Sequence, residues 1–199
     1  MEGGTFGAAV DSHDNAWLTN YGSKSITVFD KDGKPLSPPE GVNFGGRLGL
    51  MQGVIVTPNG DVWVLGIEKD QLVLFRNGDL EKGRILCEGD SAEPCKSFKA
   101  PFHLGVDQQD RIWVSNRGVD HVTRFPASDP GKAENFGVGI NSSGLAIDSQ
   151  GNVWITERFG NGLLGMAHLV DMGLRLKFEG VAAASDYLTK TMSEQKGGR

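Results

Sequence analysis

Four polar residues of this 199-residue chain occur at equivalent or neighbouring positions of a repeated segment. We expect the repeat to bring their side chains close together. Asn20, Asn116 and Glu157 each follow a tryptophan by three residues, and His103 opens a repeated block. Oxygen-rich ligand sets of this kind favour Ca²⁺ or Mg²⁺, and imidazoles favour Zn²⁺. Such a metal polarises an ester carbonyl or phosphoryl oxygen and lowers the pKa of a bound water. We therefore predict a divalent-metal site at His103, Asn116, Glu157 and Asn20, with His103 and Glu157 as catalytic residues and His103 as ligand or general base.

Further polar residues neighbour these positions and are predicted to bind substrate. They are Gln52, Glu68, Arg117, His121, Asn141 and Arg158. Each of these positions also has a purely structural alternative. The asparagines could cap turns, Glu157 could pair with a nearby arginine, and His103 could bond to backbone carbonyls.

The elements that position these side chains come from a fourteen-residue block that occurs four times without a gap, at 7–20, 53–66, 103–116 and 144–157. Each block has a short apolar run, a polar turn and a second run around a tryptophan, which predicts a β-hairpin. Turn pairs such as Asn59-Gly60 and Gln150-Gly151 favour tight hairpin turns. The tryptophans lie 46, 50 and 41 residues apart, at Trp17, Trp63, Trp113 and Trp154.

This spacing is the length of one four-stranded propeller blade, so we predict an all-β propeller in which the tryptophans pack between blades. The predicted blades span about 5–50, 51–100, 101–140 and 141–166. Apolar residues three to five positions apart then predict a helical tail over 167–199. Propellers close with four to eight blades, so the chain is either a minimal ring or an incomplete one. We favour the incomplete ring and expect a homo-oligomer to complete it.

The blocks AIDSQGNVWITE and GVDQQDRIWVSN resemble NHL-type propellers, and more closely the streptogramin B (virginiamycin B) lyase group. The resemblance covers about residues 5–166. It implies a cluster of His and Glu near the channel mouth. With the assistance of magnesium, this cluster abstracts a proton and so opens a cyclic ester. His103 and Glu157 match repeat positions of that group. The second histidine of the group, two residues from a glutamate, has no counterpart in this sequence.

Composition excludes several other classes of function. The net charge is −5 and no basic stripe is present, so we predict no nucleic-acid partner. No apolar stretch is long enough to span a bilayer, and no membrane partner is predicted. Neither a phosphate-cradling loop nor a dinucleotide fingerprint occurs, so no nucleotide or organic cofactor is expected.

The remaining predictions concern location and the two cysteines. The first residues lack the features of a signal peptide, which predicts a cytoplasmic chain as given, although a longer natural parent could be exported. Cys87 and Cys95 could form a short-loop disulfide or remain free thiols.

The predicted function is that of a small-molecule enzyme at the channel mouth, a metal-assisted hydrolase or lyase that acts on an ester, lactone or phosphoester. The alternative is a non-catalytic propeller that binds a ligand or a protein, because propeller blades serve many unrelated functions.

Overall fold

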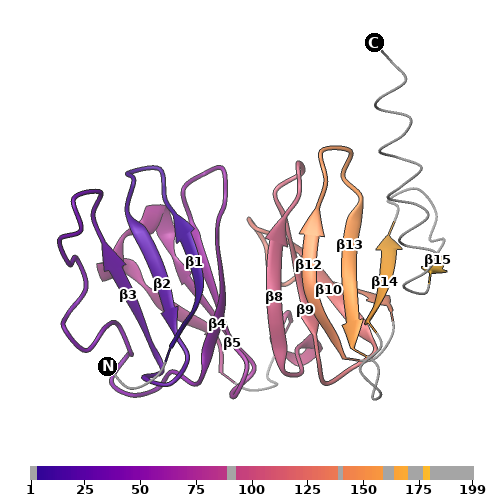
Figure 1. Ribbon diagram of the computed structural model, residues 1–199, viewed down its shortest axis with the longest axis horizontal. Helices are drawn as coiled ribbons and strands as arrows, with labels where there is room; N and C mark the ends of the chain where they lie inside the picture. The colour runs from indigo at the N-terminus through magenta and orange to yellow at the C-terminus, as the bar shows by residue number, and fades with distance from the viewer. Residues whose placement is uncertain (1–3, 89–92, 139–140, 159–163, 170–176, 180–199) are drawn as a thin grey trace, which may run out of the picture.

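The computed structural model describes residues 4–88, 93–138, 141–158, 164–169 and 177–179. These residues form four antiparallel sheets, which are the predicted blades (Figure 1). The only helical segments among them are short 3₁₀ turns at Arg76–Gly78, Leu80–Lys82 and Cys95–Ser97. None of these turns is long or apolar enough to cross a membrane. The predicted all-β propeller is confirmed.

Each blade runs from an innermost strand outward in chain order. Blade 1 contains β1 (Thr5–Val10), β2 (Ala16–Asn20) and β3 (Ser25–Phe29). Blade 2 contains β4 (Met51–Val56), β5 (Val62–Gly66), β6 (Gln71–Phe75) and β7 (Arg84–Cys87). Blade 3 contains β8 (Pro101–Val106), β9 (Arg111–Asn116), β10 (His121–Pro126) and β11 (Glu134–Gly137). Blade 4 contains β12 (Ser142–Ile147), β13 (Val153–Arg158), β14 (Leu164–Leu169) and β15 (Lys177–Glu179).

The hairpin between the first two strands closes in the same way in all four blades. The residue with a positive φ stands at one repeat position, occupied by Asp14, Gly60, Asp110 and Gly151. Glycine adopts this left-handed backbone readily, and aspartate tolerates it better than most residues. The turn residues identified in the sequence therefore fix the hairpin register.

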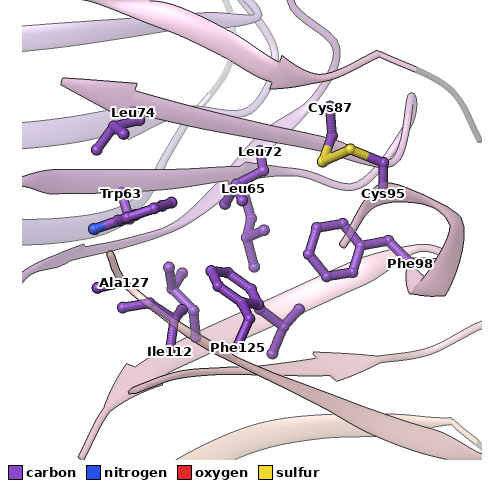
Figure 2. Close-up of a cluster of buried hydrophobic side chains, with 12 residues drawn as sticks. Trp63, Leu65, Leu72, Leu74, Cys87, Cys95, Phe98, Ile112, Phe125 and Ala127 are labelled. Atoms are coloured by element: carbon purple, nitrogen blue, oxygen red, sulfur yellow. A yellow bond between two sulfur atoms is a disulfide. The ribbon is translucent and has the colours of Figure 1, made fainter. Parts of the chain in front are cut away.

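Tryptophans pack each blade against the next one, as predicted. The ring centroid of Trp17 lies 4.9 Å from that of Phe75 in blade 2. The ring centroid of Trp63 lies 5.8 Å from that of Phe125 in blade 3, and both rings are drawn in Figure 2. Trp113 is buried in a cluster that contains Leu145 of blade 4. Burial of these large rings stabilises the interfaces between blades.

The two cysteines form a disulfide, which settles the alternative left open by the sequence. Cys87 ends β7 and Cys95 lies in the 3₁₀ turn that follows. Both belong to the buried cluster between blades 2 and 3, together with Phe98 (Figure 2). The disulfide therefore joins the outermost strand of blade 2 to the segment that leads into blade 3.

The fourth blade extends beyond the predicted boundary at residue 166. Strand β14 continues to Leu169, and β15 lies at Lys177–Glu179, inside the segment predicted to be helical. Both strands pair within the sheet of blade 4 because β13 offers β14 a free edge, and β14 offers one to β15. The rest of the predicted helical tail, 170–176 and 180–199, lies outside the described residues.

Candidate functional site

The end of the sheets at which the first strands begin is the predicted channel mouth, and every first strand has a bulge there. The pairing of the first two strands shifts register just after the first residue of β1, β4, β8 and β12. Bulges re-aim side chains next to them. The residues that follow the first residue of the strand, at one repeat position, are Phe6, Gln52, Phe102 and Ser143.

A hydroxyl two residues after the tryptophan holds the bulge in blades 1, 3 and 4. Thr19 Oγ1 accepts from Gly7 N at 2.8 Å, and Ser115 Oγ accepts from His103 N at 3.1 Å. The same Ser115 hydroxyl donates to Ser143 O of the next blade at 2.6 Å. One hydroxyl thus fixes both the bulge and the neighbouring blade.

Aromatic rings and one guanidinium gather at this mouth, and we call Phe6, Tyr21, Phe102 and Arg117 the mouth cluster. The ring centroids of Phe6 and Phe102 are 5.6 Å apart in an edge-to-face arrangement, and those of Phe6 and Tyr21 are 6.2 Å apart. Arg117 Cζ lies 4.0 Å from the centroid of Phe102, in a cation–π contact. Phe6 is 50% exposed and Tyr21 is 37% exposed, so the cluster presents aromatic surface to solvent.

Three polar side-chain atoms at or beside the mouth are buried without a hydrogen-bond partner. They are Gln52 Oε1, His103 Nδ1 and Arg117 Nε. Buried polar atoms are nearly always satisfied in folded proteins, so a group of unsatisfied ones is a candidate for ligand contact.

His103 departs from the repeat, which has glycine at this position in the other three blades. A Cβ added at Gly7 would lie 2.4 Å from Gln52 O, and one at Gly53 would lie 2.5 Å from Leu104 Cδ2. Only blade 3 accepts a side chain there. Burial lowers the pKa of His103, and a hydrogen bond with the backbone of Leu145 opposes this in part. Burial therefore favours the neutral form of the imidazole.

The two asparagines predicted as metal ligands hold their own blades together. Asn116 Nδ2 donates to Thr123 Oγ1 at 3.1 Å, and Asn116 Oδ1 accepts from Lys99 N at 3.3 Å. Asn20 Nδ2 donates to Thr27 Oγ1 at 2.6 Å in the equivalent pair of blade 1. Both side chains are buried and engaged, which matches the structural alternative for these residues.

The described part of the chain contains no group of three or more His, Cys, Asp or Glu side chains that could hold a metal. Glu157 and Arg158 are placed on β13 by their backbone, and their side chains lie outside the described residues.

Other residues predicted to bind substrate have local partners. Glu68 forms an exposed ion pair with Lys24 at 2.8 Å. His121 Nε2 lies 3.0 Å from Ser97 O. Asn141 has a φ of 66° just before β12, where asparagine favours a turn. Among the described residues predicted to contact substrate, only Gln52 and Arg117 have an unsatisfied buried atom.

Sequence reasoning did not identify the aromatic part of the mouth cluster. Phe6 and Phe102 occupy one repeat position in blades 1 and 3, and Tyr21 and Arg117 occupy another. An aromatic residue at the start of two first strands was the available signal. Its meaning depended on the ring contact between blades that are not neighbours.

The sequence matches no family model and no curated protein. Solved structures match the fold, and the chain spans about half the length of these proteins. A streptogramin B lyase structure is 17% identical with a TM-score of 0.67, covering 90% of this chain and 55% of the lyase. The virginiamycin B lyase of Staphylococcus aureus is 16% identical with a TM-score of 0.68, covering 91% and 57%. The hydrazine synthase of Kuenenia stuttgartiensis is 10% identical with a TM-score of 0.71, covering 90% and 51%. The chain is thus a β-propeller whose fold resembles that of the lyase group.

Proposed function

We propose that the channel mouth is a small-molecule site at which the chain cleaves an ester, lactone or phosphoester bond as a hydrolase or lyase. The observation that carries the proposal is the buried, unpartnered Nδ1 of His103, which is next in sequence to Phe102 of the mouth cluster. An aromatic surface that binds a ligand and a base beside it are the two parts such a reaction needs.

In this proposal His103 accepts a proton and the rest of the mouth orients the ligand. As a hydrolase, His103 takes the proton from a water that attacks the carbonyl or phosphoryl centre, the bond from that centre to the ester oxygen breaks, and the alcohol leaves. As a lyase, it takes the proton from the carbon next to the one that carries the ester oxygen, the C–O bond breaks, a C=C bond forms and the carboxylate leaves.

A general base acts best when its pKa lies near the working pH, because the unprotonated form is then abundant and still basic enough to accept a proton. Burial favours the unprotonated form of His103. The bulge hydrogen bond from His103 N to Ser115 fixes the strand that carries the imidazole.

The described residues do not fit the predicted metal site as a whole, because the amides of Asn20 and Asn116 are engaged within their blades. We therefore assign no step of the reaction to a metal. A divalent cation held through His103 and Glu157 stays a prediction. Metal analysis of purified protein and activity with and without a chelator test it.

His103→Ala tests the catalytic proposal against activated esters, lactones and a phosphotriester. We expect the rate to fall by roughly 10² to 10⁴, the usual contribution of a general base. His13→Ala is the matched control, because His13 stands in a hairpin turn with its side chain 67% exposed. Circular dichroism checks folding. An unchanged rate in a folded His103→Ala variant rules out His103 as the base.

A non-catalytic binding propeller is the second candidate. The side-chain amides of Asn20 and Asn116 are hydrogen-bonded within their own blades. Few side chains at the mouth are then available to act as metal ligands or catalytic groups, which favours the non-catalytic candidate. Saturable ligand binding without turnover, in protein supplied with divalent cations, would support this candidate.

We also propose that copies of the chain associate through the open side of blade 1. Val10 on β1 is 63% exposed, whereas the equivalent Val56 and Val106 are partly buried by the preceding blades. A second copy would cover this apolar strand face. Light scattering at micromolar concentration is expected to show an oligomer, and a monomer would rule this assembly out.

The predicted cytoplasmic location is opposed by the disulfide between Cys87 and Cys95. Such bonds persist mainly in oxidising compartments. We therefore propose an oxidising compartment as the place of action. Thiol labelling of the protein in freshly lysed cells tests this, since two reactive thiols would favour the cytoplasm.

A further inference from the structure

The contact between Phe6 and Phe102 joins two blades that are not neighbours. Phe6 lies on β1 and Phe102 on β8, while β4 of blade 2 packs between these strands. Gln52 occupies the same repeat position on β4 and is 3% exposed. The two rings therefore meet above the strand that carries Gln52.

Gln52 has a buried side-chain oxygen that accepts no hydrogen bond. Its side-chain Oε1 is buried and unpartnered, while its backbone oxygen accepts from Thr19 Oγ1 at 2.5 Å. The backbone bond holds the residue at a fixed place on the strand. A buried acceptor of this kind is destabilising unless a donor meets it. A ligand with an N–H or O–H group would satisfy it.

The guanidinium of Arg117 is a cation with no ion-pair partner among the described residues. Its guanidinium lies over the ring of Phe102, Nε is unpartnered, and no described carboxylate forms an ion pair with it. Guanidinium groups bind carboxylates through paired, charge-assisted hydrogen bonds. The cation stands on the same ring that contacts Phe6, so the aromatic surface and the positive charge form one unit.

We propose that the mouth cluster and Gln52 form one subsite for a flat aromatic carboxylate that carries a hydrogen-bond donor. The ring of the ligand separates Phe6 from Phe102, its donor reaches Gln52 Oε1, and its carboxylate pairs with Arg117. Phe6 is half exposed and can rotate aside on the fast timescale of surface side chains. The inference rests on the small-molecule site of the proposed function and names its ligand class.

Two probes that differ by one atom test the subsite. Indole-2-carboxylate has a flat ring, a carboxylate and an N–H, and benzofuran-2-carboxylate replaces the N–H by oxygen. Calorimetry on the full chain is expected to show binding of the indole about tenfold tighter than that of the benzofuran, the usual effect of one hydrogen bond. Equal affinities, or no binding of either probe at millimolar concentration, would overturn the subsite.

Variants locate the effect at the proposed residues. Gln52→Leu is expected to abolish the tenfold preference for the indole, and Arg117→Gln to weaken both probes. Gln109→Leu is the matched control, because Gln109 is an exposed glutamine in the β8–β9 hairpin turn. A preference that persists in a folded Gln52→Leu variant overturns the role of Gln52. Probe binding by a chain without esterase activity would leave the subsite standing and refute the catalytic proposal alone.

Discussion

Blades 2 and 3 are neighbours built on one repeat, yet they hold their strands together by different means. Blade 3 uses hydrogen bonds: Ser115 fixes its bulge and Asn116 bonds to Thr123. In blade 2 the residues equivalent to Ser115 and Thr123 are Leu65 and Val73, both completely buried in apolar clusters. The same backbone can thus be fixed by polar bonds or by apolar packing.

The tryptophan environment shows the same difference. In blade 3, Trp113 Nε1 donates to Asp107 Oδ2 at 2.8 Å, and blades 1 and 4 have the equivalent bond. Thr57 replaces the aspartate in blade 2, and Trp63 Nε1 is buried without a partner. Thr57 instead lines a cavity of about 310 Å³ at the hairpin end of blades 2 and 3. Blade 2 therefore lacks the tryptophan–aspartate hydrogen bond of the other blades, and burial of its apolar side chains stabilises it instead.

The largest effect is expected for Leu65→Ala. Removal of this completely buried side chain leaves a cavity and should lower the free energy of unfolding by about 2–5 kcal/mol. Ser115→Ala at the equivalent position of blade 3 removes a hydroxyl from a bonded bulge and should lower it by about 1–3 kcal/mol. Urea unfolding of both variants measures the difference. A larger loss of unfolding free energy for Ser115→Ala than for Leu65→Ala would mean that the hydrogen bonds of blade 3 stabilise the protein more than the apolar packing of blade 2.

A second effect concerns the disulfide that joins blade 2 to the segment before blade 3. The Cys87→Ala/Cys95→Ala double variant should lose about 2–3 kcal/mol, because the unfolded chain gains freedom without the crosslink. Unfolding with and without a reductant measures this. The wild-type protein should be weakened by the reductant and the variant should not. Equal sensitivity of both proteins would contradict the prediction.

Acid should weaken blade 4 at Asp148, the aspartate that bonds to its tryptophan. Burial alone would raise the pKa of Asp148, but hydrogen bonds from Asn152, Trp154 and the backbone outweigh it and hold the pKa at about 2. A folded-state pKa below the unfolded value stabilises the protein above about pH 4. This contribution should disappear as the pH falls from about 4 to about 2.

Thermal unfolding across this range tests the acid prediction in the wild-type protein and in Asp148→Asn. The variant should show a smaller loss of stability, because its side chain cannot take up the proton. The same pH dependence in both proteins would mean that Asp148 contributes nothing to it.

The smallest effect is expected for Thr57→Asp. This substitution gives blade 2 the aspartate that the other three blades have at the equivalent position. A carboxylate there would accept from Trp63 Nε1 and should raise the free energy of unfolding by about 1 kcal/mol at pH 7. Thr57→Val is the control of similar size and should lower it, because the Thr57 hydroxyl donates to Asp61 O at 3.0 Å. A destabilised Thr57→Asp would mean that blade 2 cannot accept the repeated bond.

The sequence by itself determined the fold. Four in-register blocks with a tryptophan each, and turn residues such as Gly60 and Gly151 at one position, are local signals that specify hairpins and their spacing. The resemblance to the lyase group followed from the same blocks and is matched by the solved structures of that fold.

Only the tertiary structure decided which polar residues are available at the mouth. Asn116 and Gln52 are both buried amides near the ends of strands, and their sequence contexts do not tell them apart. Asn116 finds donors and acceptors within blade 3, whereas Gln52 Oε1 finds none. The contact of Phe6 with Phe102 likewise depends on how three blades turn around the channel. Such long-range contacts are set by blade packing, which no local pattern encodes.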